Sequence, residues 1–237
     1  CPSALFASEP GGFAGLLGVP VPGLELKLVA NNDKMEARYR GKNVFPGYWR
    51  QPELTAKVFD EEGFYCTGDA LKFVDINDAS KGMLFDGRIA EDFKLNTGTW
   101  VHVGALRAQL IAAGNGLIQD VVITGHDTEF IGAIVFPGME YCKKMIGAEN
   151  ATLHEVIHHV AIKKQLQDIL YALAAKNTGS ATFIKRAVMA DFILNIDKGE
   201  ITDKGSVNQR MIIQNHPQTV ARLYEANMDD TVIEVRK

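Results

Sequence analysis

The sequence is poor in cysteine, has no excess of positive charge and contains no long apolar run. Its three cysteines, Cys1, Cys66 and Cys142, lie far apart and are odd in number, which disfavours a disulfide framework and indicates a reducing compartment. The net charge of -4 excludes a generally basic nucleic-acid-binding protein. No apolar segment reaches the roughly 20 residues that span a bilayer, and no signal peptide stands at the start. We therefore expect a cytoplasmic protein with no membrane span and no nucleic-acid partner.

Length and composition are those of a globular protein. The 237 residues leave room for one large or two small domains, and the content of 46% hydrophobic and 23% charged residues excludes intrinsic disorder. The first residue is Cys1, followed by Pro2, and not methionine. We therefore expect this chain to be a fragment of a longer protein.

The first part of the chain is predicted to be rich in β-structure. Residues 1–28 contain many glycines and prolines, which indicate turns. From Leu24 onward, alternating apolar residues predict a hairpin with strands over 24–28 and 35–39. The other expected elements of this part are a short helix from Pro52 and strands at 64–66, 70–75 and 83–85.

The second part is predicted to mix helices and strands. Apolar residues three and four apart over 152–177 give the longest helix signal in the chain. The other expected elements are a helix at 104–113, strands at 121–123, 131–136 and 187–193, and a closing helix at 204–214. The two parts divide near residues 86–91. We therefore expect the fold class α/β (α+β), with a β-rich subdomain followed by a small α+β domain.

One segment of the long predicted helix has the spacing of a zinc site. His154, Glu155 and His158 form a literal H-E-x-x-H, in which two imidazoles on one helix face could bind zinc. The positions where an extended metalloprotease motif needs glycine and a third histidine hold Ala161 and Lys164. We therefore interpret the motif as a solvated helix face and predict no metal ligands, with a zinc hydrolase as a distant alternative.

The start of the same helix carries a capping signal. Asn150, Ala151 and Thr152 form a glycosylation sequon, which matters only in a secreted protein. Thr152 or Asn150 followed by Glu155 is instead typical of a helix N-terminus.

The strongest candidate site lies in the β-rich part. Thr67, Gly68 and Asp69 follow a predicted strand, so that a carboxylate comes directly after a residue that lets the backbone approach a ligand. A carboxylate can accept hydrogen bonds from two vicinal hydroxyls, such as those of a ribose. Arg88 comes nineteen residues after Asp69 and has a fork geometry suited to hydroxyls or phosphate.

A family resemblance rests on the order of five segments, residues 15–23, 40–49, 59–69, 87–94 and 199–205. This series closely resembles the carboxyl-terminal part of the adenylate-forming superfamily, which includes acyl-CoA synthetases, peptide-synthetase adenylation domains and luciferases. The variant segment 94–101 and the closing 202–205 look most like feruloyl-CoA synthases and related aryl-CoA ligases.

The resemblance implies a two-step activity. In such enzymes a carboxylate attacks the α-phosphate of ATP and releases pyrophosphate, and the thiol of coenzyme A then attacks the acyl-adenylate. The substrates and cofactors implied are ATP, Mg²⁺, coenzyme A and a small-molecule carboxylic acid of the hydroxycinnamate (feruloyl) type.

The resemblance also implies roles for single residues. Asp69 would bind the ribose hydroxyls, and Arg88 would contact the ribose. Lys204 matches the lysine that reaches the active site during adenylation, and Lys94 lies where many aryl-CoA ligases carry a lysine that contacts the adenylate. A mobile ammonium group there would stabilise the charge that develops on phosphoryl oxygens in the transition state.

A small domain that turns between the two steps is a further implication. Ala90 would lie at the hinge, and Gly98, Thr99 and Trp100 would line the tunnel for the pantetheine arm of coenzyme A. Residues 1–87 would be the last β-subdomain of the large adenylating domain, and residues 88–237 the mobile lid domain.

Two elements of the superfamily are absent from these residues. The phosphate loop and the Thr-Glu element lie upstream of residues 15–23 in the family, as does most of the acyl pocket. We therefore expect the upstream large domain to be missing and the isolated chain to be inactive. Two alternatives stay open beside the CoA ligase. One is the adenylation module of a carboxylic acid reductase, which shares the inserted residue before Gly98, and the other is a non-catalytic interaction module.

Overall fold

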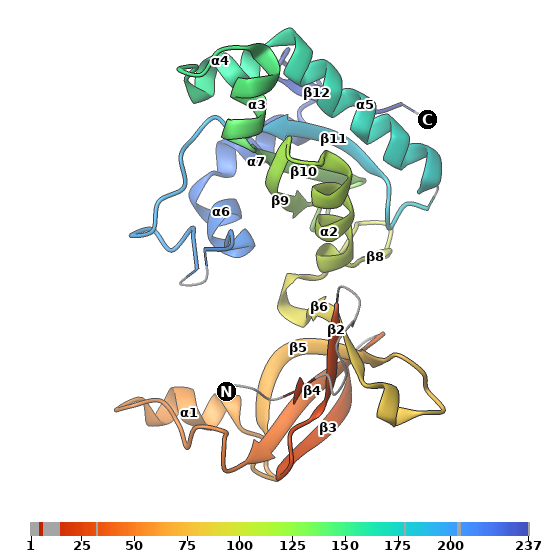
Figure 1. Ribbon diagram of the computed structural model, residues 1–237, viewed down its shortest axis with the longest axis vertical. Helices are drawn as coiled ribbons and strands as arrows, with labels where there is room; N and C mark the ends of the chain where they lie inside the picture. Colours follow the sequence, from red (N-terminus) through yellow and green to blue (C-terminus); the bar gives the residue numbers. More distant parts are fainter. Residues whose placement is uncertain (1–4, 7–14, 32, 178, 203–204, 237) are drawn as a thin grey trace. The chain divides into compact units, whose positions relative to one another are not determined.

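The chain folds into two compact units, residues 1–90 and 91–237. The computed structural model describes residues 5–6, 15–31, 33–177, 179–202 and 205–236. The first unit is built mainly of strands and the second of strands and helices, so the mixed α/β class predicted from the sequence is confirmed (Figure 1). Among the described residues, none of the helices combines the length and apolar character that crossing a membrane requires.

The first unit contains one six-stranded antiparallel sheet. Its strand order is β1-β2-β6-β5-β4-β3. The elements are β1 (Leu5–Phe6), β2 (Leu16–Pro20), β3 (Leu24–Asn31), β4 (Lys34–Gly41), α1 (Pro52–Val58), β5 (Tyr65–Phe73), a 3-10 turn (Ala79–Lys81), β6 (Met83–Arg88) and a second 3-10 turn (Ile89–Glu91).

The predicted hairpin is confirmed as β3 and β4. Their pairing runs without interruption from Leu24 opposite Gly41 to Asn31 opposite Lys34. Because side chains alternate between the two faces of a strand, Leu24 is buried with Ala37 in the core of this unit. Strand β2 was not predicted, because its glycine and proline residues indicate turns.

The second unit contains a four-stranded sheet in the order β12-β11-β10-β9. Strands β10 and β11 are parallel, and the other pairs are antiparallel. A two-stranded ribbon comes first in this unit. The elements are β7 (Phe93–Lys94), β8 (Trp100–Val101), α2 (Val103–Gly114), β9 (Ile118–Thr124), β10 (Ile131–Pro137), α3 (Met139–Ile146), α4 (Leu153–His158), α5 (Val160–Lys176), β11 (Ile184–Met189), α6 (Gln209–Asn215), α7 (Pro217–Tyr224) and β12 (Val232–Glu234).

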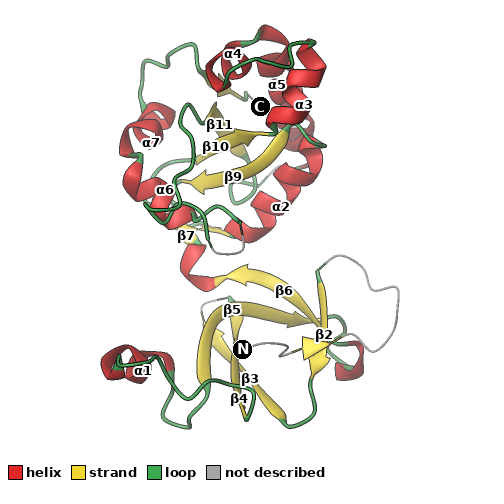
Figure 2. Cartoon of the chain, turned by 60° about the vertical axis from the view of Figure 1, so that its left-hand side comes forward, coloured by secondary structure: helices red, strands yellow, loops and turns green. Residues whose placement is uncertain are grey.

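Helices pack on both faces of this sheet, as Figure 2 shows. Val121 and Ile123 of β9 belong to a core cluster that includes side chains of α2, α3, α4 and α5. Val122, which points to the opposite face, packs with Ile212 of α6 and Leu223 of α7. The continuous apolar runs of β9 and β10 therefore reflect burial on two faces.

The prediction of one helix over 152–177 is wrong. The chain is extended at His159 (ψ 128°), where α4 ends and α5 begins. The His159 Nδ1 atom accepts a hydrogen bond from the amide of Ala161 at 3.2 Å, so its side chain caps α5. Val160 is consequently 79% exposed, although the helical period places it on the apolar face.

Two other predictions in this unit are displaced. Strand β11 begins three residues before the predicted position and ends at Met189, after which Ile193 is 82% exposed in a loop. Helix α6 begins at Gln209 and not at residue 204, because the Asn208 side chain accepts a hydrogen bond from the amide of Met211 and caps the helix there. Helix α7 and strand β12 follow without having been predicted.

Candidate functional site

The segment Thr67-Gly68-Asp69 lies within a strand. The sequence predicts two strands separated by a turn, and the structure contains the single strand β5. Arg38 pairs with Cys66 and Glu36 with Ala70, so that Ala37 of β4 faces all three residues of the segment. The three residues therefore form a bulge in β5, with Gly68 in the left-handed region at φ +70°.

Asp69 and Arg88 lie opposite each other on neighbouring strands. They are register partners in the pairing of β5 with β6. The Nε atom of Arg88 lies 3.4 Å from Oδ1 of Asp69, and the two side chains are 64% and 38% exposed. The carboxylate is thus held next to a cation and is accessible to a ligand from solvent.

A cluster of aromatic side chains lies at the start of β5. Phe45, Tyr48, Phe59 and Tyr65 form a cluster with ring centroids 5.0 to 5.7 Å apart. Burial, the hydrogen bond to Tyr48 and the charge of Asp69 raise the pKa of Tyr65 to about 12. The Tyr65 hydroxyl therefore carries its proton at neutral pH. The cluster cannot be recognised from the sequence alone, because its members are spread over three segments.

Burial and the charge of Asp69 also raise the pKa of a fifth aromatic side chain, that of Tyr39 on β4, to about 12. Tyr39 pairs with Tyr65 across β4 and β5. The negative charge of Asp69 therefore raises the pKa of tyrosines on two neighbouring strands.

In the second unit, four predicted site residues lie in one hairpin. Lys94 pairs with Trp100 in the β7–β8 ribbon, and the Lys94 Nζ atom lies 5.0 Å from the centroid of the indole ring. Gly98 closes the turn between them at φ +81°, and its amide donates to the carbonyl of Leu95 at 2.9 Å. The hydroxyl of Thr99 lies 3.4 Å from that of Ser180. The ribbon therefore presents an exposed ammonium group beside an aromatic ring.

The two remaining predicted residues occupy very different positions. Ala90 is an exposed residue in the 3-10 turn Ile89–Glu91, where the first compact unit ends. Lys204, together with Asp203, lies outside the described residues. The roles of both residues stay predictions.

The chain on either side of residues 203–204 is held by a buried carboxylate. Glu200 is 1% exposed, and its oxygens accept hydrogen bonds from the amide of Asn195 at 2.8 Å and from Asn215 Nδ2 at 3.0 Å. His216 Nε2 lies 2.9 Å from Glu200 Oε1. Ile201 pairs with Val207 in an isolated bridge. These two residues also line a largely apolar cavity of about 680 Å³.

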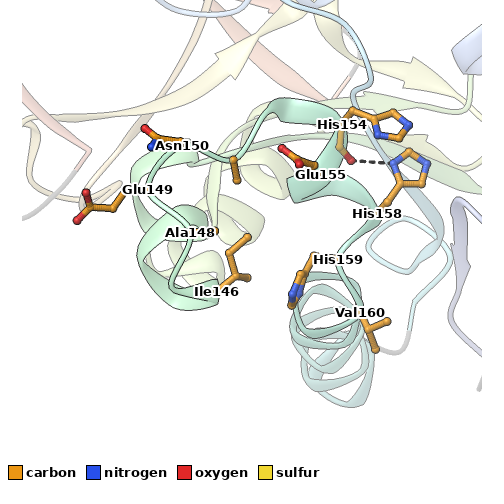
Figure 3. Close-up of a pocket in the computed structure, with 10 residues that line it drawn as sticks. Ile146, Ala148, Glu149, Asn150, His154, Glu155, His158, His159 and Val160 are labelled. Carbon is orange, nitrogen blue, oxygen red and sulfur yellow. Dashed lines mark hydrogen bonds between the residues drawn. The ribbon is translucent and has the colours of Figure 1, made fainter.

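The glutamate of the H-E-x-x-H segment, Glu155, caps the N-terminus of α4. The predicted cap is confirmed, because Thr152 Oγ1 accepts from the amide of Glu155 while the Glu155 carboxylate accepts from the amide of Thr152 at 2.7 Å. The rings of His154 and His158 stack with centroids 4.2 Å apart, beside a cavity of about 880 Å³ (Figure 3). In the part of the chain that the structure describes, no group of three His, Cys, Asp or Glu side chains is placed to hold a metal ion.

Comparison with curated proteins finds acyl-activating enzymes. The chain is 24% identical over 226 residues to the probable chloroplastic acyl-activating enzyme 16 of Arabidopsis thaliana, which covers 89% of this chain and 31% of the relative. It is 27% identical over 214 residues to a long-chain-fatty-acid–CoA ligase of Mycobacterium tuberculosis, covering 89% of this chain and 34% of that protein. The chain thus spans about a third of the length of these relatives. No family model matches the sequence.

Solved structures show the same fold. The A domain of carboxylic acid reductase from Segniliparus rugosus, solved with AMP and a co-purified carboxylic acid, superposes with a TM-score of 0.66 and 22% identity. The match covers 90% of this chain and 34% of that domain. The fold and the curated relatives therefore support the adenylate-forming enzymes as the family to which this chain is related.

Proposed function

We propose that this chain supplies part of the nucleotide site and the lid domain of an ATP-dependent enzyme that activates carboxylic acids. The observation that carries the proposal is the pair of Asp69 and Arg88, which the sheet register places opposite each other with an accessible carboxylate. A carboxylate that faces solvent beside a guanidinium group can accept two hydrogen bonds from the vicinal hydroxyls of a ribose. Arg88 would contact the same sugar.

In the first step, a carboxylate oxygen of the acid attacks the α-phosphorus of ATP, and the bond to pyrophosphate breaks. We assign to Lys204 the electrostatic stabilisation of the charge that develops on the phosphoryl oxygens, and to Lys94 a contact with the adenylate. Mg²⁺ would arrive with the phosphates of ATP.

In the second step, the sulfur of a thiol attacks the acyl carbonyl carbon and AMP leaves, while the thiol proton passes to solvent. We propose coenzyme A as the thiol and a hydroxycinnamate of the feruloyl type as the acid. Residues 98–100 would line the path of the pantetheine arm, and residues near Ala90 would form the hinge. In this assignment residues 1–87 are the end of the large domain and residues 88–237 are the lid.

A second candidate is the adenylation domain of a carboxylic acid reductase. The fold that this chain shares with the solved S. rugosus domain favours this candidate. At 22% identity, the similarity supports a shared fold and not a shared reaction. In that case the thiol would belong to a carrier domain, and the thioester would be reduced to an aldehyde by a nicotinamide cofactor.

Product analysis separates these candidates. The protein encoded by the complete reading frame that contains this chain is incubated with ATP, Mg²⁺ and a panel of aryl and fatty acids, with either coenzyme A or NADPH. Acid-dependent AMP together with an acyl-CoA supports the ligase, and an aldehyde formed with NADPH supports the reductase. The Lys94→Ala variant is expected to lower AMP formation about a hundredfold, while Lys176→Ala, an exposed lysine on α5, leaves it unchanged. Absence of AMP with every acid would contradict the proposal.

A further inference from the structure

The bulge at Thr67-Gly68-Asp69 interrupts the regular pairing of β5 with β4, and specific side chains bind backbone groups at this interruption. A bulge removes regular pairing from the residues that it inserts. The carbonyl of Ala37, which faces the bulge, accepts a hydrogen bond from the Thr67 hydroxyl at 2.6 Å. The same hydroxyl accepts from the amide of Asp69 at 3.0 Å. The Thr67 hydroxyl therefore connects the Asp69 amide of β5 to the Ala37 carbonyl of β4.

The Gly68 amide is held by a buried carboxylate. Glu36, on the neighbouring strand, is 7% exposed and accepts from this amide through Oε1 at 3.2 Å. Its other oxygen, Oε2, is bound by Arg38, with Nε at 2.9 Å and Nη2 at 2.8 Å. Arg38 is fixed in turn by Asp60, which lies 3.1 Å from Nη1. Arg38 thus orients the Glu36 carboxylate through Oε2, and Oε1 holds the amide of Gly68, whose backbone is left-handed.

Burying a carboxylate is costly unless its oxygens are paired. Glu36 lies next to Ala37, directly across from the bulge. The regular part of β5 needs no such group, because its amides have strand partners. The placement of this carboxylate therefore points to a requirement for the bulge itself.

We propose that Glu36 and Thr67 are positioning residues for the recognition of ribose by Asp69, an inference that rests on the proposed function. They contact the backbone on both sides of Gly68 and so set the direction in which the Asp69 carboxylate leaves the strand. A carboxylate that accepts from two hydroxyls at once depends on direction, because hydrogen bonds weaken steeply as their angle falls. In this role each residue acts through Asp69, because the contacts of Glu36 and Thr67 described above are with backbone groups of the bulge and of Ala37.

The test measures discrimination between sugars. With the protein from the complete reading frame, kcat/KM in acid-dependent ATP–pyrophosphate exchange is determined for ATP, 2′-deoxy-ATP and 3′-deoxy-ATP. The wild type is expected to prefer ATP by at least about tenfold. Glu36→Gln and Thr67→Val are each expected to lower kcat/KM for ATP about tenfold, mainly through KM, while the values for the deoxy analogues change less than about twofold.

Matched variants separate positioning from a general loss of structure. Thr67→Ser keeps the hydroxyl and is expected to keep the preference for ATP. Glu25→Gln, which alters an exposed carboxylate paired with Arg40 in the same sheet, is expected to behave as the wild type. If Glu36→Gln proves to be unfolded by thermal melting, the comparison of Thr67→Val with Thr67→Ser decides the question.

The outcomes distinguish this inference from the function on which it rests. Equal losses for ATP and for the deoxy analogues, or an unchanged preference in both Glu36→Gln and Thr67→Val, would overturn the positioning role. If Asp69→Asn keeps the full preference for ATP, or if the wild type shows no exchange, the proposed nucleotide site itself is wrong. A preference that is lost in Asp69→Asn and reduced in Glu36→Gln and Thr67→Val supports both.

Discussion

Arg107 of α2 and Asp120 of β9 form an ion pair with two hydrogen bonds, Nε to Oδ1 at 2.8 Å and Nη2 to Oδ2 at 2.7 Å. Asp120 Oδ2 also accepts from the amide of Val207 at 3.3 Å. The pair is mostly buried, with side chains 19% and 14% exposed. A helix, a strand and the segment after residues 203–204 are thus joined by one carboxylate.

The first prediction concerns this pair. Arg107→Ala leaves Asp120 without its main partner in a largely buried position and is expected to lower the free energy of unfolding by about 3 kcal/mol. Lys164→Ala, which removes an exposed ion pair with Asp168, serves as the control and is expected to stay close to the wild type. Urea denaturation followed by circular dichroism measures both, and equal stability of the two variants would contradict the assignment.

The second prediction is a pH dependence that comes from Glu200. Burial raises the pKa of this carboxyl, but hydrogen bonds from Asn215, from the amide of Asn195 and from His216 outweigh burial and hold the pKa below its ordinary value of 4.5. The stabilisation is therefore fully present above pH 4.5 and is lost as the pH falls through the lowered value.

Glu200→Gln tests this dependence. At pH 7 the variant is expected to be less stable than the wild type by about 1 to 3 kcal/mol, because a buried charged hydrogen-bond network is broken. As the pH falls below 4.5 the difference is expected to shrink, since the wild type loses the same stabilisation by protonation. Melting temperatures of both proteins between pH 3 and pH 7 give the measurement, and a gap that does not change with pH would argue against the role of Glu200.

The third prediction concerns the cap of α4. Thr152→Ala removes the hydroxyl that accepts from the Glu155 amide and is expected to lower the stability by about 1 kcal/mol. Thr152→Ser keeps the cap and is expected to stay within a few tenths of a kcal/mol of the wild type. Chemical denaturation of the two variants provides the comparison. Identical stabilities would mean that the capping box does not hold the helix.

Local patterns predicted those elements whose causes are local. The alternation from Leu24 to Leu28 identified the hairpin, and Thr152 followed by Glu155 identified a helix N-terminus, because each signal acts within a few residues. The break at His159 escaped prediction, since neither glycine nor proline marks it and the capping interaction comes from a histidine.

The sequence identified the two residues proposed to bind the ribose, but not the residue that holds the backbone beside them. Asp69 and Arg88 were found from residue type and order, and the register of β5 and β6 does place them opposite each other. Glu36 was not found, because its contact with Gly68 joins residues 32 positions apart in the sequence. The available signal was an acidic residue within a half-buried strand. This signal indicates no role for Glu36 until the bulge on the opposite strand is known.

The central claim is that Asp69 takes part in binding the nucleotide of an acid-activating enzyme. Its most direct test is acid-dependent ATP–pyrophosphate exchange by the protein from the complete reading frame, comparing Asp69→Asn with Asp75→Asn, an aspartate paired with Lys81 beyond the end of β5. The expected result is a loss of at least about tenfold in kcat/KM for ATP in Asp69→Asn and wild-type exchange in Asp75→Asn. Equal exchange by Asp69→Asn and the wild type would contradict the claim.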